Sequence, residues 1–273
     1  MIRLAVRVPK ESAELVLAEL AELAPGGVEE VDDGETVEYA IYGAEGELPA
    51  LPDLEAAAGE VRIEVRTSAV EDGWENRWKE FHSSVRVEGA ARSMVVSPPW
   101  EATGANDEIV VDPGRAFGTG AHPTTRLCLE LLLGEPAEGS CVDVGCGSGV
   151  LAIAAARLGW NPVLAVDHDP LSVEATRTNA QVNGAVLEAS RFDLLREGAI
   201  PGGDLVVANL LRPLLLAMAR SGFSGPGPKL LIASGLLRRE ADEVGEALCS
   251  SLGMAAERRL DDGDWSALLL RAS

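Results

Sequence analysis

Apolar runs suited to buried strands alternate with helical repeats through the second half of the chain. The runs read CVDV, PVLAVD, LVVAN and LLIAS, and each precedes a stretch with apolar residues at helical spacing. Strands of a parallel sheet are covered by helices on both faces, so they are apolar on both faces. The alternation predicts an α/β fold with a doubly wound, mostly parallel sheet. The last segment, 255–273, favours two strands around DDGD, which would add an antiparallel hairpin.

The first seventy residues have a different pattern. Strand, helix, strand, strand, helix and strand follow one another, with an Asp-Gly turn between the middle strands. We therefore expect a small ferredoxin-like α+β domain over residues 1–70. A linker helix is expected over 71–84, where Trp74, Trp78 and Phe81 share one face. That face either docks on its own domain or is free to recognise a partner. We expect the larger α/β domain over residues 85–273.

Charge narrows the choice of partner. The formal net charge is -21, and residues 1–70 contain 5 Lys or Arg against 16 Asp or Glu. Such a chain repels a bare phosphate backbone, so we expect no direct nucleic-acid binding. The acidity indicates either a well-hydrated soluble surface or a basic partner.

The cysteine content and the hydropathy of the chain indicate the cellular compartment in which it works. Four cysteines without a CxxC pair, together with three histidines, predict no metal site and reduced, buried thiols. No uncharged run approaches 18 residues, and the first residues lack a secretory signal, so we expect no membrane span. The interpretation is a cytoplasmic protein, and we expect a monomer.

A glycine-rich turn follows the first of the buried runs. Gly145, Gly147 and Gly149 have the spacing G-x-G-x-G at the end of a strand and the start of a helix. Gly145 would permit the tight turn, Gly147 the approach of a ligand to the backbone, and Gly149 close packing of helix and strand. A plain turn without a ligand is the alternative, and the spacing is not the G-x-G-x-x-G of dinucleotide sites.

Two acids beside the turn discriminate between ligands. Asp143 stands just before the turn, where a carboxylate would oppose a pyrophosphate but suit a cation. S-adenosylmethionine carries a sulfonium and an ammonium and no phosphate. Asp167 ends the next strand, where an acid accepts from the ribose hydroxyls of an adenosine cofactor. Asp169 competes for that role, but we interpret it mainly as the N-cap before Pro170.

Two later strand ends supply further candidates. Asp193 follows the third predicted strand and could accept from the adenine amino group with Phe192 against the ring, or it could cap a helix. Asn209 ends the fourth strand, at the crevice where reacting groups gather. Its amide can accept from an amine and donate to a carbonyl, and an amide in an apolar strand end needs partners. Asn209 is our candidate catalytic residue, with a role in packing as the alternative.

The segment FGTGAHPTT before the helix at 127–132 is unusually rich in glycine and hydroxyl groups. We interpret it as a lid over the cofactor, with Gly118 and Gly120 as hinges and Phe117 as the cover. Thr125 would bond the methionine end of the cofactor.

The start of the same helix needs a cap, which Thr124 or Thr125 could provide. His122 has two possible roles. Its pKa range suits a proton acceptor, and its ring nitrogens could instead brace the loop through a hydrogen bond.

Three blocks together resemble one protein family. The segments DPGRAFGTGAHPTTRLCLELL, VDVGCGSGVLAIAAARLG and VVANLLRPLL are similar to signature blocks of the bacterial ribosomal protein L-11 methyltransferases (PrmA), and WENRWKEFHSSVRV resembles that family's connector. The resemblance spans about residues 71–273. The N-terminal part matches in size and pattern only.

The resemblance implies a seven-stranded class I fold and an S-adenosyl-L-methionine-dependent protein methyltransferase. Its substrate would be ribosomal protein L-11, methylated on lysine and N-terminal amines. The resemblance also implies that the small domain over residues 1–70 recognises this substrate and that residues 85–273 form the catalytic domain. The family's cofactor positions fall on Thr125, Gly145, Asp167 and Asn209. Ala121 and Arg212 depart from the family pattern, and Arg212 could alter the approach of the amine.

Three alternatives stay open at this point. The same scaffold could methylate another protein or a small amine, or it could bind the cofactor without chemistry. A nicotinamide dehydrogenase is a further alternative, which the glycine spacing disfavours.

Overall fold

The computed structural model describes residues 2–13, 16, 29–32, 34–43, 61, 63–69, 83–90, 92–112 and 120–272. The chain divides into two compact units, residues 1–80 and 81–273. The division falls within the segment expected as a linker, most of which lies outside the described residues, as do Trp74, Trp78 and Phe81.

The N-terminal unit contains one antiparallel sheet of four strands. They are β1 (Ile2–Pro9), β2 (Glu29–Asp32), β3 (Thr36–Gly43) and β4 (Glu64–Ala69), in the order β2-β3-β1-β4. The first and third strands are central and pair along eight residues. This strand order is that of a ferredoxin-like domain and confirms the predicted pattern. The two expected helices fall mostly outside the described residues, apart from a short 3-10 turn, η1 (Lys10–Ser12).

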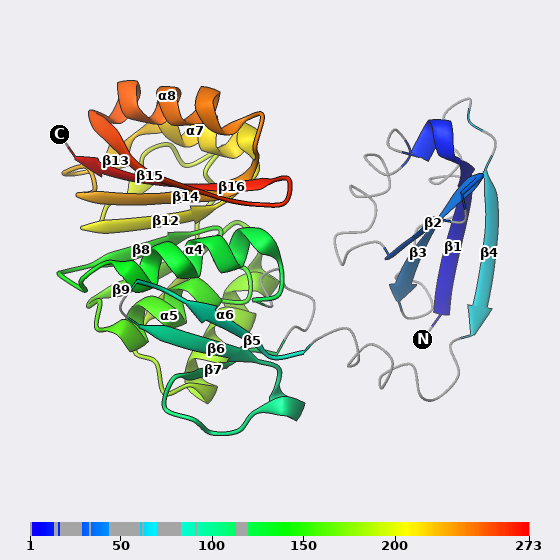
Figure 1. Cartoon of the computed structure of the whole chain (residues 1–273), viewed down its shortest axis with the longest axis horizontal. Coiled ribbons are helices and arrows are strands. Elements are labelled where there is room, and N and C mark those ends of the chain that lie inside the picture. Colours follow the sequence, from blue (N-terminus) through cyan, green and yellow to red (C-terminus); the bar gives the residue numbers. More distant parts are fainter. Residues whose placement is uncertain are drawn as a thin grey trace. The chain divides into compact units, whose positions relative to one another are not determined.

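The second unit is built on a seven-stranded sheet with the order β10-β9-β8-β12-β14-β16-β15. The five strands from β10 to β14 are parallel, and β16 runs antiparallel to both of its neighbours. The predicted doubly wound sheet with a C-terminal hairpin is confirmed (Figure 1). The strands are β8 (Cys141–Val144), β9 (Val163–Asp167), β10 (Glu188–Arg191), β12 (Leu205–Asn209), β14 (Leu230–Leu237), β15 (Met254–Asp262) and β16 (Trp265–Ala272).

Helices cover both faces of this sheet. One face carries α4 (Pro123–Gly134), α5 (Val150–Leu158) and α6 (Pro170–Val182), and the other carries α7 (Arg212–Ser221) and α8 (Ala241–Leu252). Along β12 the side chains alternate accordingly, because Val207 belongs to the first apolar cluster while Val206 and Ala208 belong to the second. Figure 1 shows the two helical layers around the strands. Among the described residues, no helix combines the length and the hydropathy needed to cross a bilayer.

The order in which the chain adds strands to the sheet reverses at β8, and this position is where a ligand would bind. From β8 the chain moves outward to β9 and β10, then returns to the other side of β8 with β12. The crevice outside the carboxyl ends of β8 and β12 is therefore the topological switch point, where open α/β sheets bind ligands. The glycine turn and Asn209 stand at these two strand ends.

Small additional strands flank the main sheet. A three-stranded sheet is formed by β5 (Val85–Glu88), β6 (Ser93–Ser97) and β7 (Glu108–Val110), with the turn η2 (Pro99–Glu101) between β6 and β7. The short strands β11 (Ile200–Pro201) and β13 (Phe223–Ser224) pair with each other. The strand β5 was not predicted, and in it exposed Arg86 and Glu88 flank buried Val87.

Asp204 fastens the amino end of β12. Its carboxylate accepts hydrogen bonds from the Ser140 amide at 2.9 Å and hydroxyl at 2.9 Å, and it pairs with Lys229 Nζ at 2.8 Å. The Lys229 ammonium and then the Ser140 donors hold the pKa of Asp204 well below its ordinary value. A lowered pKa contributes stability above the unfolded-state pKa near 3.8, and that contribution is lost as pH falls.

We expect Asp204→Ala to lower the free energy of unfolding by about 1–3 kcal/mol at pH 7. Urea denaturation at pH 7 and pH 3 measures this, and the gap to wild type should shrink at pH 3. Lys229→Met is the control, and it should cost less because the ammonium is exposed. An equal loss in both variants would contradict a role for the Ser140 bonds.

Candidate functional site

The glycine turn has the left-handed backbone that its composition predicts. Gly145, Gly147 and Gly149 have φ angles of 77°, 53° and 84°, a region that L side chains rarely enter. A Cβ at Gly149 would lie 2.8 Å from Thr176 Cγ2. Gly149 therefore allows close packing of the turn against α6, rather than of helix against strand as predicted. The next residue, Val150, begins α5.

Asp143 is a buried carboxylate with one unused oxygen. Its exposed fraction is 1%, and Oδ2 accepts from the Ala152 amide at 3.0 Å. Oδ1 has no hydrogen-bond partner among the described residues. Burial, and then the nearby charge of Asp167, raise the pKa of Asp143 to about 7, against the effect of the Ala152 amide. An acceptor in this state suits a ligand that brings an N–H donor and a positive charge.

Asp167 links the end of β9 to the turn. Its Oδ2 accepts from the Gly147 amide at 3.0 Å, and its Oδ1 accepts from the Asp169 amide at 3.0 Å. Asp169 caps α6 by accepting from the Leu171 amide at 2.9 Å, as predicted. Of the two competing acids, Asp167 is thus the one held against the glycine turn.

Asn209 and Thr125 are brought together from distant parts of the sequence. Asn209 Nδ2 donates to Thr125 Oγ1 at 3.4 Å. Thr125 is fully buried in the first turn of α4, and Asn209 is half-buried at the end of β12. Phe117, the predicted cover of the site, lies outside the described residues.

The start of α4 differs from the prediction. Pro123 is the first helical residue, and His122 is the N-cap, so neither threonine has that role. His122 Nδ1 lies 2.8 Å from Thr124 Oγ1 and accepts from the Thr124 amide at 3.4 Å, and its ring packs edge-on against Trp265 with centroids 5.0 Å apart. Burial, and then Arg126, lower the pKa of His122. The bracing role, not that of a proton acceptor, accounts for this geometry.

Asp193 stabilises a turn and caps no helix, because residues 194–196 form a turn between β10 and β11. Its Oδ1 accepts from the Leu195 amide at 3.0 Å, and its Oδ2 lies 3.4 Å from Arg196 Nε. Phe192 is partly buried against the apolar cluster beneath α7 and α8.

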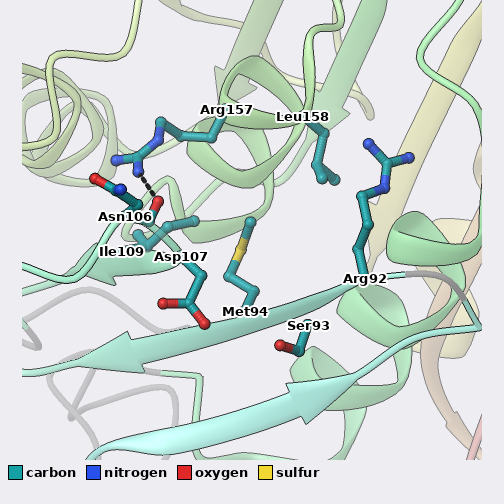
Figure 2. A pocket seen from close by; sticks show the side chains of 8 residues that line it. All are labelled: Arg92, Ser93, Met94, Asn106, Asp107, Ile109, Arg157 and Leu158. Carbon is teal, nitrogen blue, oxygen red and sulfur yellow. Dashed lines mark hydrogen bonds between the residues drawn. The ribbon is translucent and has the colours of Figure 1, made fainter.

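A pocket of about 300 Å³ lies away from these residues. Figure 2 shows it between the three-stranded sheet and the C-terminal end of α5, where Arg157 donates to the Asn106 carbonyl at 2.6 Å. Since the glycine turn precedes the opposite end of α5, this pocket is distinct from the candidate site. Its lining residues are Arg92, Ser93, Met94, Asn106, Asp107, Ile109, Arg157 and Leu158.

Comparison with known proteins decides the family. The profile of a family described as ribosomal protein L11 methyltransferase (PrmA) matches residues 4–273. The chain is 37% identical to the ribosomal protein L11 methyltransferase of Pelotomaculum thermopropionicum, over 99% of this chain and 98% of that protein. The chain belongs to the ribosomal protein L11 methyltransferase family.

Other members agree with this assignment. Identity to the family member of Dechloromonas aromatica is 43%, over 70% of this chain and 65% of that protein. The crystal structure of a ribosomal protein L11 methylase from Lactobacillus delbrueckii subsp. bulgaricus has a TM-score of 0.57 at 31% identity, covering 69% of this chain and 99% of that one. The predicted class, an S-adenosylmethionine-dependent methyltransferase, is confirmed.

The departures from the family pattern can now be placed. Arg212, at the start of α7, donates to Glu243 at 2.9 Å and 2.5 Å and so is held toward α8. Its guanidinium thereby forms an ion pair with a carboxylate of α8. Ala121 is half-buried and precedes the capping His122.

Proposed function

We propose that this chain transfers methyl groups from S-adenosyl-L-methionine to lysine ε-amines and the N-terminal α-amine of ribosomal protein L11. The observation that carries the proposal is the meeting of three polar groups at the carboxyl ends of neighbouring strands. Asp143, Asp167 and Asn209 come from β8, β9 and β12, which are adjacent in the sheet. Family membership supplies the substrate.

The residues present fit the methyl donor. The unused oxygen of buried Asp143 suits the ammonium of the methionine part. Asp167 would accept from the ribose hydroxyls, with Gly145 and Gly147 leaving room along the turn. Thr125 would contact the methionine end. Asp193 would accept from the adenine amine, and Phe117 would cover the cofactor.

For methyl transfer, the main contribution of the protein would be to bring the accepting amine and the methyl donor together in the right orientation. When bound, the donor supplies an electrophilic methyl group on a sulfonium. The accepting lysine must first lose a proton, since its ordinary pKa is about 10.4. Asn209 would orient the amine lone pair through its amide oxygen, which lowers the barrier by proximity and orientation. Solvent takes the proton, because His122 is committed to bracing α4.

The acidic N-terminal unit would recognise the substrate. Residues 1–70 have an excess of 11 acidic over basic side chains, which favours a basic protein surface through charge complementarity. We infer that the enzyme works in the cytoplasm as a monomer, without direct contact to nucleic acid. Three buried free cysteines among the described residues suit that reducing compartment.

Mass spectrometry of ribosomal proteins tests the proposal. Proteins from cells with and without this chain would be compared, and purified L11 would be incubated with the enzyme and labelled methyl donor. We expect added mass in units of a methyl group on L11 lysines and the N-terminus, only where the enzyme is present. Label on another protein or on a small amine would replace L11 as substrate. Donor binding without any labelled product would indicate a scaffold that has lost chemistry.

A further inference from the structure

The strand next to Asn209 contains an irregularity. Between Ala233 and Leu236, β14 carries one more residue than its partner β16, which is a β-bulge. Gly235 lies within it with a φ angle of 85°. Bulges of this kind place a glycine in the left-handed region and are common beside active sites. The same strand ends its parallel pairing with β12 at Ser234, opposite Asn209.

Gly235 allows the chain after Asn209 to lie against β14. A Cβ at Gly235 would lie 2.4 Å from the Leu210 carbonyl oxygen, 2.7 Å from its carbonyl carbon and 3.0 Å from its nitrogen. These are all backbone atoms, so no side-chain rotation can relieve the overlap. The Leu210 amide also donates to the Ser234 carbonyl at 3.0 Å.

The opposite side of Leu210 is also confined. A Cβ at Gly145 would lie 2.4 Å from Leu210 Cδ2, so the leucine side chain packs onto the glycine turn. Leu210 is therefore wedged between a glycine after β8 and a glycine in β14. Leu210 directly follows Asn209, whose side-chain amide donates to Thr125, so one peptide bond joins the wedge to that amide-bearing residue.

We propose that Gly235 is a positioning residue for methyl transfer. It acts through the Leu210 peptide and holds the Asn209 amide in the crevice. The proposal rests on the proposed role of Asn209. A side chain at Gly235 pushes the peptide away from β14 and moves the amide, and an error of about 1 Å in such a group can lower turnover about 100-fold.

Gly235→Ala with a matched control tests this. Gly253 ends α8 with a φ angle of 65°, and a Cβ there meets no atom within 4 Å. Gly253→Ala therefore imposes similar backbone strain without a clash near the site. For both variants we would measure kcat and KM with purified L11, the Kd of S-adenosylmethionine, and Tm. We expect Gly235→Ala to lower kcat about 10- to 100-fold with a Kd within about threefold of wild type, and Gly253→Ala to lower Tm but keep kcat.

A double variant separates positioning from general damage. If Gly235 acts through Asn209, then Gly235→Ala combined with Asn209→Ala is no slower than Asn209→Ala alone, because the two effects are not additive. Multiplicative losses in kcat, or an unchanged kcat in Gly235→Ala, would overturn the proposal for Gly235 alone. A wild-type rate in Asn209→Ala would instead remove Asn209 from the reaction, and Gly235 with it.

A substitution with less backbone strain, but the same Cβ overlap, covers the case in which the Ala variant does not fold. Asn tolerates the left-handed region better than Ala and still introduces a Cβ. Gly235→Asn would then be compared with Gly253→Asn by the same measurements. A loss of kcat in the first and not the second supports the proposal, and equal kcat values refute it.

Discussion

Asn209→Ala should lower the turnover of methyl transfer to L11 about 100-fold while leaving the Kd of S-adenosylmethionine within about threefold of wild type. Asn209 is half-buried at the carboxyl end of β12, and its Nδ2 bonds to Thr125 at 3.4 Å. With the amide nitrogen engaged, its oxygen is the group that we propose to meet the accepting amine. Its contribution is therefore to the orientation of the amine and not to the retention of the methyl donor.

Single-turnover kinetics with labelled donor and purified L11, together with calorimetric titration of the donor, measure the two quantities separately. Asn183→Ala is a useful control because Asn183 bonds both the amide and the carbonyl of Val110 at the C-terminal end of α6, whereas the N-terminal end of α6 follows Asp167. That variant should lose stability and keep turnover per folded molecule. An undiminished rate in Asn209→Ala would exclude it from the mechanism.

Asp143→Asn should have opposite effects on cofactor binding and on stability. The charge lost is the one that the cofactor ammonium would meet, so we expect the donor's Kd to rise about 10- to 100-fold. In the protein without cofactor, the same buried charge lowers the stability of the folded state. Burial raises the pKa of Asp143 to about 7 from an ordinary 3.8, so the folded state holds a proton that the unfolded state has released.

The sign of the pH dependence follows from that difference. Between about pH 4 and pH 7 the folded state binds more protons at Asp143, so its contribution to the free energy of unfolding falls as pH rises. Asp143→Asn should remove this decrease in the free energy of unfolding with pH. At pH 8 the variant should be more stable than wild type by about 1–3 kcal/mol, a figure that includes the cost of replacing the carboxylate that accepts from the Ala152 amide. In wild type, donor affinity should rise from pH 6 to pH 8 as the carboxylate ionises.

Denaturation and donor titration at pH 5, 6, 7 and 8 measure both effects. Asp169→Asn is the matched control, because Asp169 caps α6 through Leu171 at the same end of the sheet. That variant should leave the pH dependence of donor affinity unchanged. If the donor affinity of wild type is flat from pH 6 to pH 8, Asp143 is not the group that meets the ammonium.

Much of the fold was predictable because buried strands have a recognisably apolar composition. The strands β8, β12 and β14 are covered on both faces, so their residues are apolar almost throughout, and they were identified as parallel strands. The strand β5 was missed because it is four residues long, with Arg86 and Glu88 exposed on either side of Val87. So short an alternating segment has no period that separates it from a loop.

At the candidate site, rules based on neighbouring residues predicted helix caps in part and could not predict contacts between distant segments. The cap of α6 by Asp169 was predicted from Asp-Pro alone, but the same rule was misapplied at α4, where Pro123 already indicated that the cap was His122. The unused oxygen of Asp143 and the wedge around Leu210 depend on which strands become neighbours. Gly235 carried one signal in the sequence, a glycine at the end of an apolar strand, which is consistent with a bulge.

The interior position of β16 in the sheet affects how the protein folds during synthesis and what a truncated chain would do. Residues 265–272 pair with β14 on one side and β15 on the other, so the last strand of this sheet to be translated lies in its interior. A nascent chain ending before Trp265 would expose two unpaired strand edges, which are templates for aggregation. The larger unit therefore completes its sheet only after residue 272 has left the ribosome, and a nonsense mutation upstream of β16 would yield an aggregating protein rather than a shorter enzyme.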